Sequence, residues 1–392
     1  MEPPISPVSD RSTLVDYFPD EVDGYKQLQL LSPLFLVDNT KYGGRGCFAK
    51  FELEESQKIF ECKHPLSSTI IKQFRKEVCT TCFTYQEGKT LKFKLSKQLP
   101  KQVYSLYFCT QQCLQQFVND DIDEILTTTL LNVEKYYTKG LKNGDPPIKE
   151  PPKENLWETI DLEWKNVDLW ESSIEYLPNH KLLNHLPIIS DSDYTEIKYI
   201  FGILFQQFKF NHFEVPSTKY YHQLNDQELK KFDLKIFDIL QSNELPKVEK
   251  YPYLLYSYIN IYKFIRIIAP IEFSSFVSPQ NIKRIIGSNL SNAFGIWSNS
   301  NNPQEDKEYY GFGVYPCASF FNHSCDPNLI KMRVNNKLVF KTKRKIEPGE
   351  ELCIDYGNYL DEDVLIRQSQ LKEWFFDCGC TKCYADLRSL SI

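Results

Sequence analysis

Three cysteines lie close together near the end of the chain, at Cys378, Cys380 and Cys383. Thiolates are preferred ligands of zinc, but a structural zinc takes four Cys or His ligands in a tetrahedron. The fourth ligand must come from elsewhere, and the best candidate is Cys325, in the run Asn322-His-Ser-Cys-Asp-Pro-Asn. We predict a zinc ion that ties the C-terminal tail to this Asn-His-Ser-Cys loop, where two distant segments meet and a cofactor site can form.

A second set of cysteines occurs earlier in the chain. The pairs Cys79-x2-Cys82 and Cys109-x3-Cys113 are separated by 26 residues. Both spacings suit a zinc site in which each pair supplies two thiolates from one turn. The alternative is four unrelated buried cysteines. We therefore expect two structural zinc ions in all, and we assign the remaining cysteines, which lie in apolar runs, to the core: Cys47, Cys62, Cys317 and Cys353.

Other residues that could bind a ligand or take part in catalysis are ambiguous when each is taken alone. Gly44, Arg45 and Gly46 follow Gly43 in a glycine-rich turn that suits either close backbone approach to a ligand or a plain hairpin. Asn322 and His323 offer amide and imidazole hydrogen bonds to a ligand, or His323 is a satisfied core histidine. Tyr356 lies at the end of an apolar strand-like run, and it too is either a ligand-contacting residue or a core residue.

The elements that must position these residues change type along the chain. Short apolar runs between turn residues indicate strands from Leu28 to Cys62, and helical periodicity dominates from about Trp157 to Ala269. We expect helices over 120–140, 194–210, 226–240 and 252–269, with Asn225 or Asp226 as the N-cap of the third. After Pro279 we expect strands again, with a hairpin turn at Asn335-Asn336 and a strand over 351–355.

Composition bounds the class of protein. The 392 residues carry a net charge of -6, which argues against a dedicated nucleic-acid binder. The apolar stretch Tyr251–Ala269 contains Lys263, Arg266 and several tyrosines, so we expect a packed helix and no membrane span. Met1 to Asp10 is acidic and proline-rich without an apolar core, unlike a secretory signal, so we expect residence in the cytoplasm, the nucleus or both.

The order of the motifs resembles the SET-domain protein lysine methyltransferases. A glycine-rich turn is followed by Asn-His-Ser-Cys-Asp-Pro-Asn, by Gly349-Glu-Glu-Leu, by Asp355-Tyr-Gly and by the tail cysteines. More closely, the chain resembles the subgroup in which a MYND zinc finger splits the SET domain, and the shorter fungal members of that group. The resemblance extends from about residue 25 to residue 385.

The resemblance implies S-adenosylmethionine as methyl donor, with Tyr356 as the catalytic residue and a protein lysine as the acceptor. Aromatic side chains would line the lysine channel, with Tyr315, Trp374 and Phe375 as candidates. By position, the cofactor residues would be Gly44, Arg45, Gly46, Asn292, Asn322, His323 and Phe376.

The implied fold is α+β, with a β-rich SET core of small sheets and a pseudoknot. The finger is reduced, because residues 83–108 hold no second Cys-x2-Cys pair and no His-x3-Cys follows Cys113. This leaves open a catalytically inactive SET/MYND-like interaction module as the alternative; in either case we expect a monomer. The expected parts are a disordered acidic tail (1–24), the N-terminal SET part (25–78), the MYND-like finger (79–117), a helical insert (118–275) with a proline-rich loop near 141–154, the C-terminal SET core (276–358) and a zinc-binding post-SET segment (359–392).

Overall fold

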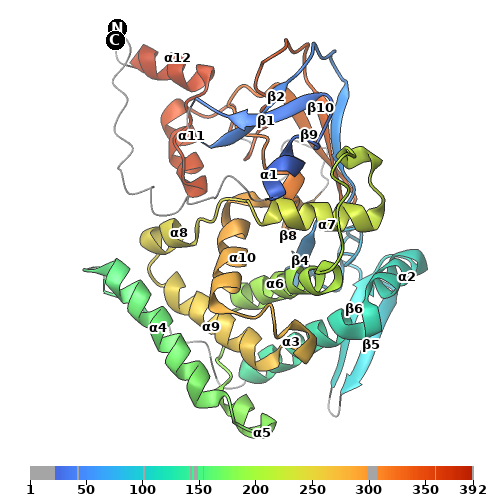
Figure 1. Cartoon of the computed structure of the whole chain (residues 1–392), viewed down its shortest axis with the longest axis vertical. Helices are drawn as coiled ribbons and strands as arrows, with labels where there is room; N and C mark the ends of the chain where they lie inside the picture. Colours follow the sequence, from blue (N-terminus) through green and yellow to red (C-terminus); the bar gives the residue numbers. More distant parts are fainter. Residues whose placement is uncertain are drawn as a thin grey trace.

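A computed structural model describes residues 23–41, 44–99, 102–141, 144, 149–152, 154–298, 307–357 and 359–390. The first and last strands and the tail helices lie at one end of the molecule, many helices of the insert lie toward the other, and the finger with its hairpin projects to one side of them (Figure 1). This agrees with the α+β class expected from the sequence. Residues 1–22 of the predicted acidic tail (1–24) lie outside the described residues. Much of the proline-rich loop near 141–154 lies outside them as well.

The sheets in the described part of the chain are all small and antiparallel. The described strands form the sheets β1-β2, β3-β10-β9, β4-β8-β7 and β5-β6, so the order within a sheet often departs from the order in the chain. The strands are β1 (Phe35–Asn39), β2 (Arg45–Ala49), β3 (Lys58–Cys62), β4 (Ser67–Ile70), β5 (Phe93–Leu99), β6 (Gln102–Phe108), β7 (Ala293–Trp297), β8 (Tyr309–Val314), β9 (Leu329–Val334) and β10 (Lys337–Thr342).

The helices expected in the insert are present. Two of them begin with reciprocal capping boxes, Ser190 with Asp193 and Asn225 with Glu228, which satisfy backbone N–H groups at the first turn. The helices are α1 (Asp23–Leu28), α2 (Gln111–Asp120), α3 (Ile125–Gly140), α4 (Leu156–Ile174), α5 (Asn179–Leu182), α6 (Asp191–Phe210), α7 (Asp226–Phe237), α8 (Glu244–Lys250), α9 (Leu254–Ile268), α10 (Pro279–Asn292), α11 (Val364–Leu371) and α12 (Thr381–Leu390).

Three expectations about local structure were wrong. A helix, α10, follows Pro279 before the strands resume, because Ser278 caps it, proline suits its first turn, and Ile282 and Ile286 are buried at helical spacing. The helix expected over 120–140 is present as α3, but it begins later than predicted, at Ile125, since residue 120 is the last of α2. There the Asp121 carboxylate accepts the N–H groups of residues 126 and 127 and starts α3 anew.

The third correction concerns residues 351–355, which form isolated bridges and no regular strand. This segment lies between β2 and the Asn-His-Ser-Cys loop. On one side, Leu352 N donates to the Cys47 carbonyl at 2.8 Å; on the other, Ile354 N donates to the Asn322 carbonyl at 2.8 Å. The crossing matches the pseudoknot implied by the family resemblance, and it brings the Asn-His-Ser-Cys loop to the edge of β2.

An aromatic cluster fixes this crossing in the main core. The ring of Phe321 stacks on Phe340 of β10 with centroids 4.5 Å apart and meets Phe35 of β1 edge-on at 5.3 Å. Such pairs add about 0.5–1.5 kcal/mol each beyond burial. Because Phe321 directly precedes Asn322, the cluster sets the position of the loop that carries the site. None of the helices in the described part of the chain is long and apolar enough to span a bilayer.

Candidate functional site

The side chain of Asn322 joins three segments that are distant in sequence. Its amide nitrogen donates to the Arg45 carbonyl at 3.1 Å and to Glu351 Oε1 at 2.8 Å. Gly46 makes this approach possible, because a Cβ at that position would lie 2.5 Å from Glu351 Oε1 and 2.8 Å from Asn322 Nδ2. The glycine turn, the Asn-His loop and the Gly-Glu-Glu-Leu segment therefore meet at one point, as the sequence suggested for the first two.

Arg45 and Asn292 contact the same short stretch of the insert. The Arg45 guanidinium donates to the Ile239 carbonyl at 2.8 Å and lies over the ring of Phe320 at 5.3 Å. The Asn292 amide, at the end of α10, donates to the Gln241 carbonyl at 3.4 Å. Gly44 is exposed in the turn with a φ of 72°, a conformation that favours glycine. Two of the predicted cofactor residues, Arg45 and Asn292, thus border residues 239–241.

His323 links the loop to the tail cysteines. Its side chain is 0% exposed, and burial lowers the pKa of the imidazole, which favours the neutral ring. Nδ1 accepts the backbone N–H of Tyr356 at 3.2 Å, so the proton of the neutral ring is on Nε2, which faces Cys325 Sγ at 3.3 Å. One histidine therefore holds the backbone of the predicted catalytic residue and donates toward a predicted zinc ligand.

Tyr356 lies among aromatic rings. Its hydroxyl donates to the Phe321 carbonyl at 3.2 Å, and burial raises its pKa, so the phenol stays protonated. Its ring centroid lies 5.4 Å from His323, 6.1 Å from Phe376 and 6.2 Å from Trp374. The arrangement offers a protonated hydroxyl beside an apolar aromatic surface.

The other two channel candidates have different neighbours. Tyr315, buried at the end of β8, donates its hydroxyl to the Asn336 carbonyl at 2.7 Å and packs against Phe294. Phe375 has a φ of 63° and lies under Lys247 Nζ at 5.6 Å. Their place in a lysine channel stays a prediction.

The four tail cysteines converge. The sulfur atoms of Cys325, Cys378, Cys380 and Cys383 all lie within 4.8 Å of one another, with Cys325 at 3.5 Å from Cys383. Four thiolates at about 2.3 Å from a tetrahedral zinc are roughly 3.8 Å apart, so the set fits one zinc. A hydrogen bond between the Cys378 and Cys380 thiols lowers the pKa of Cys380 and raises the pKa of Cys378.

The tail cluster also has a charged neighbour that the sequence did not reveal. Arg367 of α11, only 2% exposed, donates to Cys383 Sγ at 3.7 Å and to Asp386 at 2.5 Å. Its guanidinium would offset part of the charge of four thiolates around a divalent ion. Arg367 and Glu351 are the site neighbours that sequence reasoning missed; only the position of Glu351 within the Gly-Glu-Glu-Leu motif gave a signal.

The finger cysteines form a second cluster with the same geometry. Cys79, Cys82, Cys109 and Cys113 have their sulfur atoms within 4.8 Å of one another, and Cys82 lies 3.4 Å from Cys109. A hydrogen bond from the Cys79 thiol lowers the pKa of Cys82 to about 4. This donor set fits a second zinc. The pairing of residues 79–82 with 109–113 that the spacing predicted is present in the structure.

The sequence that forms this site also matches a known protein family. A family model described as "SET domain" matches residues 44–357. The chain belongs to the SET domain family. This match begins at the glycine turn and ends one residue after Tyr356, so it contains the crossing, the finger cysteines and Cys325, while Cys378, Cys380 and Cys383 lie beyond it.

Curated relatives of the SET domain family extend the comparison. "Potential protein lysine methyltransferase SET6" of Saccharomyces cerevisiae is 29% identical over 92% of this chain and 97% of its own length. A SET and MYND domain-containing protein of Dictyostelium discoideum is 35% identical over 28% of this chain and 26% of its own. Human "Histone-lysine N-methyltransferase SMYD3" is 38% identical over 19% of this chain and 17% of its own. The last two likenesses are therefore partial.

Proposed function

We propose that this SET-family chain is an S-adenosylmethionine-dependent protein-lysine N-methyltransferase. The observation that carries the proposal is the meeting of Asn322, His323 and Tyr356 at the crossing of three segments, with the ring of Phe376 against His323 and Tyr356. The likeness to the yeast protein along nearly its whole length supports the same activity.

The residues that would hold the cofactor are those of the crossing and its borders. The fit rests on a donor and aromatic set of amide, imidazole and phenyl groups that suits a cationic adenosyl ligand. Gly46 contributes by letting the Asn322 and Glu351 side chains approach the turn. S-adenosylmethionine supplies an electrophilic methyl group when bound. We assign its binding to Gly44, Arg45, Gly46, Asn292, Asn322, His323 and Phe376.

The chain's own contribution is positioning and control of protonation. A lysine amine has a pKa of about 10.4 in water and must be neutral to react. An apolar surface such as that of Trp374 and Phe376 disfavours the ammonium form. The Tyr356 hydroxyl, held at the Phe321 carbonyl, can orient the neutral amine, since burial keeps the phenol protonated.

We assign both cysteine clusters a structural role. Four thiolates leave no open position for a substrate on a tetrahedral zinc. We further propose a monomer that acts on a histone or cytosolic protein in the cytoplasm, the nucleus or both.

Transfer of a labelled methyl group tests the proposal. The purified chain is incubated with S-adenosylmethionine carrying a tritiated methyl group, together with histones and with a cytosolic extract, beside Tyr356→Phe. We expect labelled lysine with the native chain and a loss of at least about 100-fold in the variant, since orientation is worth several kcal/mol. Calorimetry should show that both bind the cofactor. Cofactor binding without transfer by the native chain would assign it to the inactive interaction module; absence of binding would overturn the cofactor assignment as well.

A further inference from the structure

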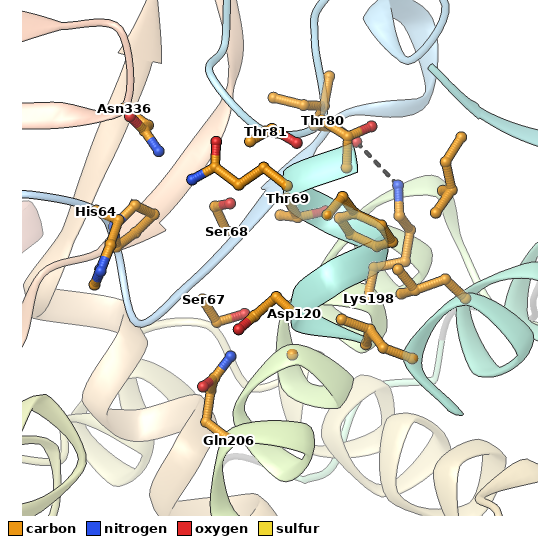
Figure 2. A pocket seen from close by; sticks show the side chains of 18 of the residues that line it. His64, Ser67, Ser68, Thr69, Thr80, Thr81, Asp120, Lys198, Gln206 and Asn336 are labelled. Atoms are coloured by element: carbon orange, nitrogen blue, oxygen red, sulfur yellow. Dashed lines mark hydrogen bonds between the residues drawn. The ribbon is translucent and has the colours of Figure 1, made fainter. Parts of the chain in front are cut away.

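One cavity of the described structure is lined by none of the residues that we assign to methyl transfer. It has a volume of about 780 Å³ and is lined by β4, by the turn of the finger at Thr80 and Thr81, by α2 and by α6 (Figure 2). In the sheet β4-β8-β7, β4 is at the edge opposite to β7, the strand that directly follows Asn292. None of the residues assigned to the cofactor or the lysine channel lines the cavity, and Tyr315 approaches it only through its hydrogen bond to the carbonyl of the lining residue Asn336.

One wall of the cavity is an open strand edge. The register pairs Ser67 with Val314 and Thr69 with Phe312, and Ile71 N donates to the Tyr310 carbonyl at 2.9 Å. Since backbone groups alternate in an antiparallel pair, those of Ser68 and Ile70 face away from β8. Lys198 Nζ reaches the Ile70 carbonyl at 3.4 Å from that side. Among the described residues, the Ser68 N–H and C=O and the Ile70 N–H have no partner on this open edge.

The opposite wall is a face of amide side chains. Gln112, Gln115, Gln116 and Asn119 follow one another at i, i+3, i+4 and i+7 on α2, and all four are exposed and line the cavity. Amides both donate and accept, so they suit the alternating groups of a peptide backbone. The finger holds this wall, because Thr80 and Thr81 lie between its zinc ligands and Thr81 Oγ1 donates to the Cys113 carbonyl at 3.0 Å.

Buried polar atoms without partners line the same cavity. Gln206 Oε1 and Thr69 Oγ1 have no hydrogen-bond partner among the described residues, although Gln206 is 6% exposed and Thr69 is 3% exposed. Gln206 and Thr69 are both drawn among the lining side chains in Figure 2. A buried polar group without a partner costs about 1–3 kcal/mol, so these atoms favour a ligand with hydrogen-bonding groups.

The charges in the cavity leave a positive surplus. Its acids already have cations: Glu134 pairs with Arg75 at 3.1 Å, Asp120 with Lys209 at 2.5 Å and Asp226 with Lys63 at 3.3 Å. In contrast, Lys198 and Lys230 donate only to carbonyl groups and have no carboxylate within 4.0 Å among the described residues. Burial lowers the pKa of Lys198 to about 8, and a carboxylate beside it would offset that cost.

We propose that this groove binds an extended acidic segment of a partner protein, which adds to the free edge of β4 through Ser68 and Ile70 and places a carboxylate near Lys198. Strand addition to an open edge is a common mode of peptide recognition. β4 has four residues, so the paired part of the segment would be about 13 Å long. The inference does not rest on the proposed methyl transfer, and binding of the segment is measured without the cofactor.

A phage-displayed library of random dodecapeptides, selected on the full chain, provides the probe. Enriched peptides are synthesised with a fluorophore, and their affinity is measured by anisotropy. Ser68→Pro removes an N–H that faces the open edge and leaves the ladder to β8 intact, whereas Ser68→Ala keeps the edge. We expect peptides rich in Asp or Glu, with binding weakened about tenfold or more by S68P and unchanged by S68A. Failure to enrich a peptide, or equal binding to S68P and the native chain, would overturn the proposal.

Zinc content and the unfolding midpoint show whether S68P folds. If it does not, a second variant provides the test. Lys198→Met removes the charge and retains most of the stem, and we expect about tenfold weaker binding of the acidic peptide but no change for its Asn/Gln counterpart. Equal affinity of K198M for the acidic peptide would contradict the proposal. Displacement of the probe by a synthetic peptide of residues 1–22, with comparable affinity, would assign the groove to the chain's own N-terminal segment and overturn the assignment to a partner.

Discussion

The finger cysteines and the tail cysteines form clusters of the same chemistry in different surroundings. Each cluster has four sulfur atoms within 4.8 Å of one another. The finger cluster packs in a small satellite core with residues of β5, β6 and α2. The tail cluster packs with Trp374 and Phe376 and touches His323 through Cys325. Equal ligand sets therefore stabilise different parts of the molecule.

The difference follows from how much chain each cluster spans. The finger ligands lie within one stretch, 79–113, so a zinc bound there would close a local hairpin and helix. The tail ligands begin at Cys325 and resume at Cys378, so a zinc bound there would close a long loop that contains Tyr356. We infer that the tail zinc shapes the cofactor site, while the finger zinc shapes the wall of the groove along β4.

The largest contrast is expected between alanine substitutions at two fully buried ligands, Cys383 and Cys79, each 0% exposed. Both variants should lose one zinc by atomic emission. Cys383→Ala also removes a partner of buried Arg367, so we expect its main unfolding transition to be destabilised by about 3 kcal/mol or more. Cys79→Ala should mainly loosen the finger. Similar shifts of the main urea transition in both variants would remove the distinction.

Asn322→Ala sharpens the comparison by damaging the site without touching a ligand. The substitution leaves the Arg45 carbonyl and Glu351 without the donor that joins them. We expect about tenfold or greater loss of S-adenosylmethionine affinity in calorimetry, since one unsatisfied buried group costs about 1–3 kcal/mol. Zinc content should stay at two per chain. Loss of zinc in this variant would mean that the tail cluster depends on the site and does not support it.

The smallest effect is expected where the tail meets the insert. Lys250 Nζ lies 2.6 Å from Glu373 Oε1, but the two side chains are 34% and 47% exposed, so the pair is screened by solvent. We expect Lys250→Ala to change the free energy of unfolding by less than about 1 kcal/mol in urea titration. A larger loss would show that ion pairs hold the tail in place as much as the metal does.

Features set by local spacing were predictable from the sequence. The two cysteine sets, the turn at Asn335-Asn336 and the cap at Asn225 each depend on neighbouring residues, and the structure contains all of them. The helix α10 was missed because the strands that follow it led us to place the start of the C-terminal β-rich part at Pro279. Tertiary neighbours such as Arg367 gave no signal, because nothing in α11 alone indicates that it faces a sulfur cluster.

The groove along β4 was likewise beyond sequence reasoning. Its open edge depends on strand order, which places β4 outside β8, and its other wall comes from a helix of the finger. Such a surface exists only once the finger, the SET core and the insert have packed together.

Cofactor affinity in two matched ligand variants tests the central claim most directly. Cys325→Ala and Cys113→Ala each remove one ligand from one cluster, and titration calorimetry with S-adenosylmethionine compares them after their zinc content is measured. We predict that Cys325→Ala loses its zinc and binds the cofactor at least about tenfold more weakly, because His323 loses its sulfur partner and Phe376 its anchor. Cys113→Ala should lose the other zinc and bind the cofactor with native affinity. Native affinity in Cys325→Ala, with that zinc lost, would contradict the claim that the tail cluster shapes the cofactor site.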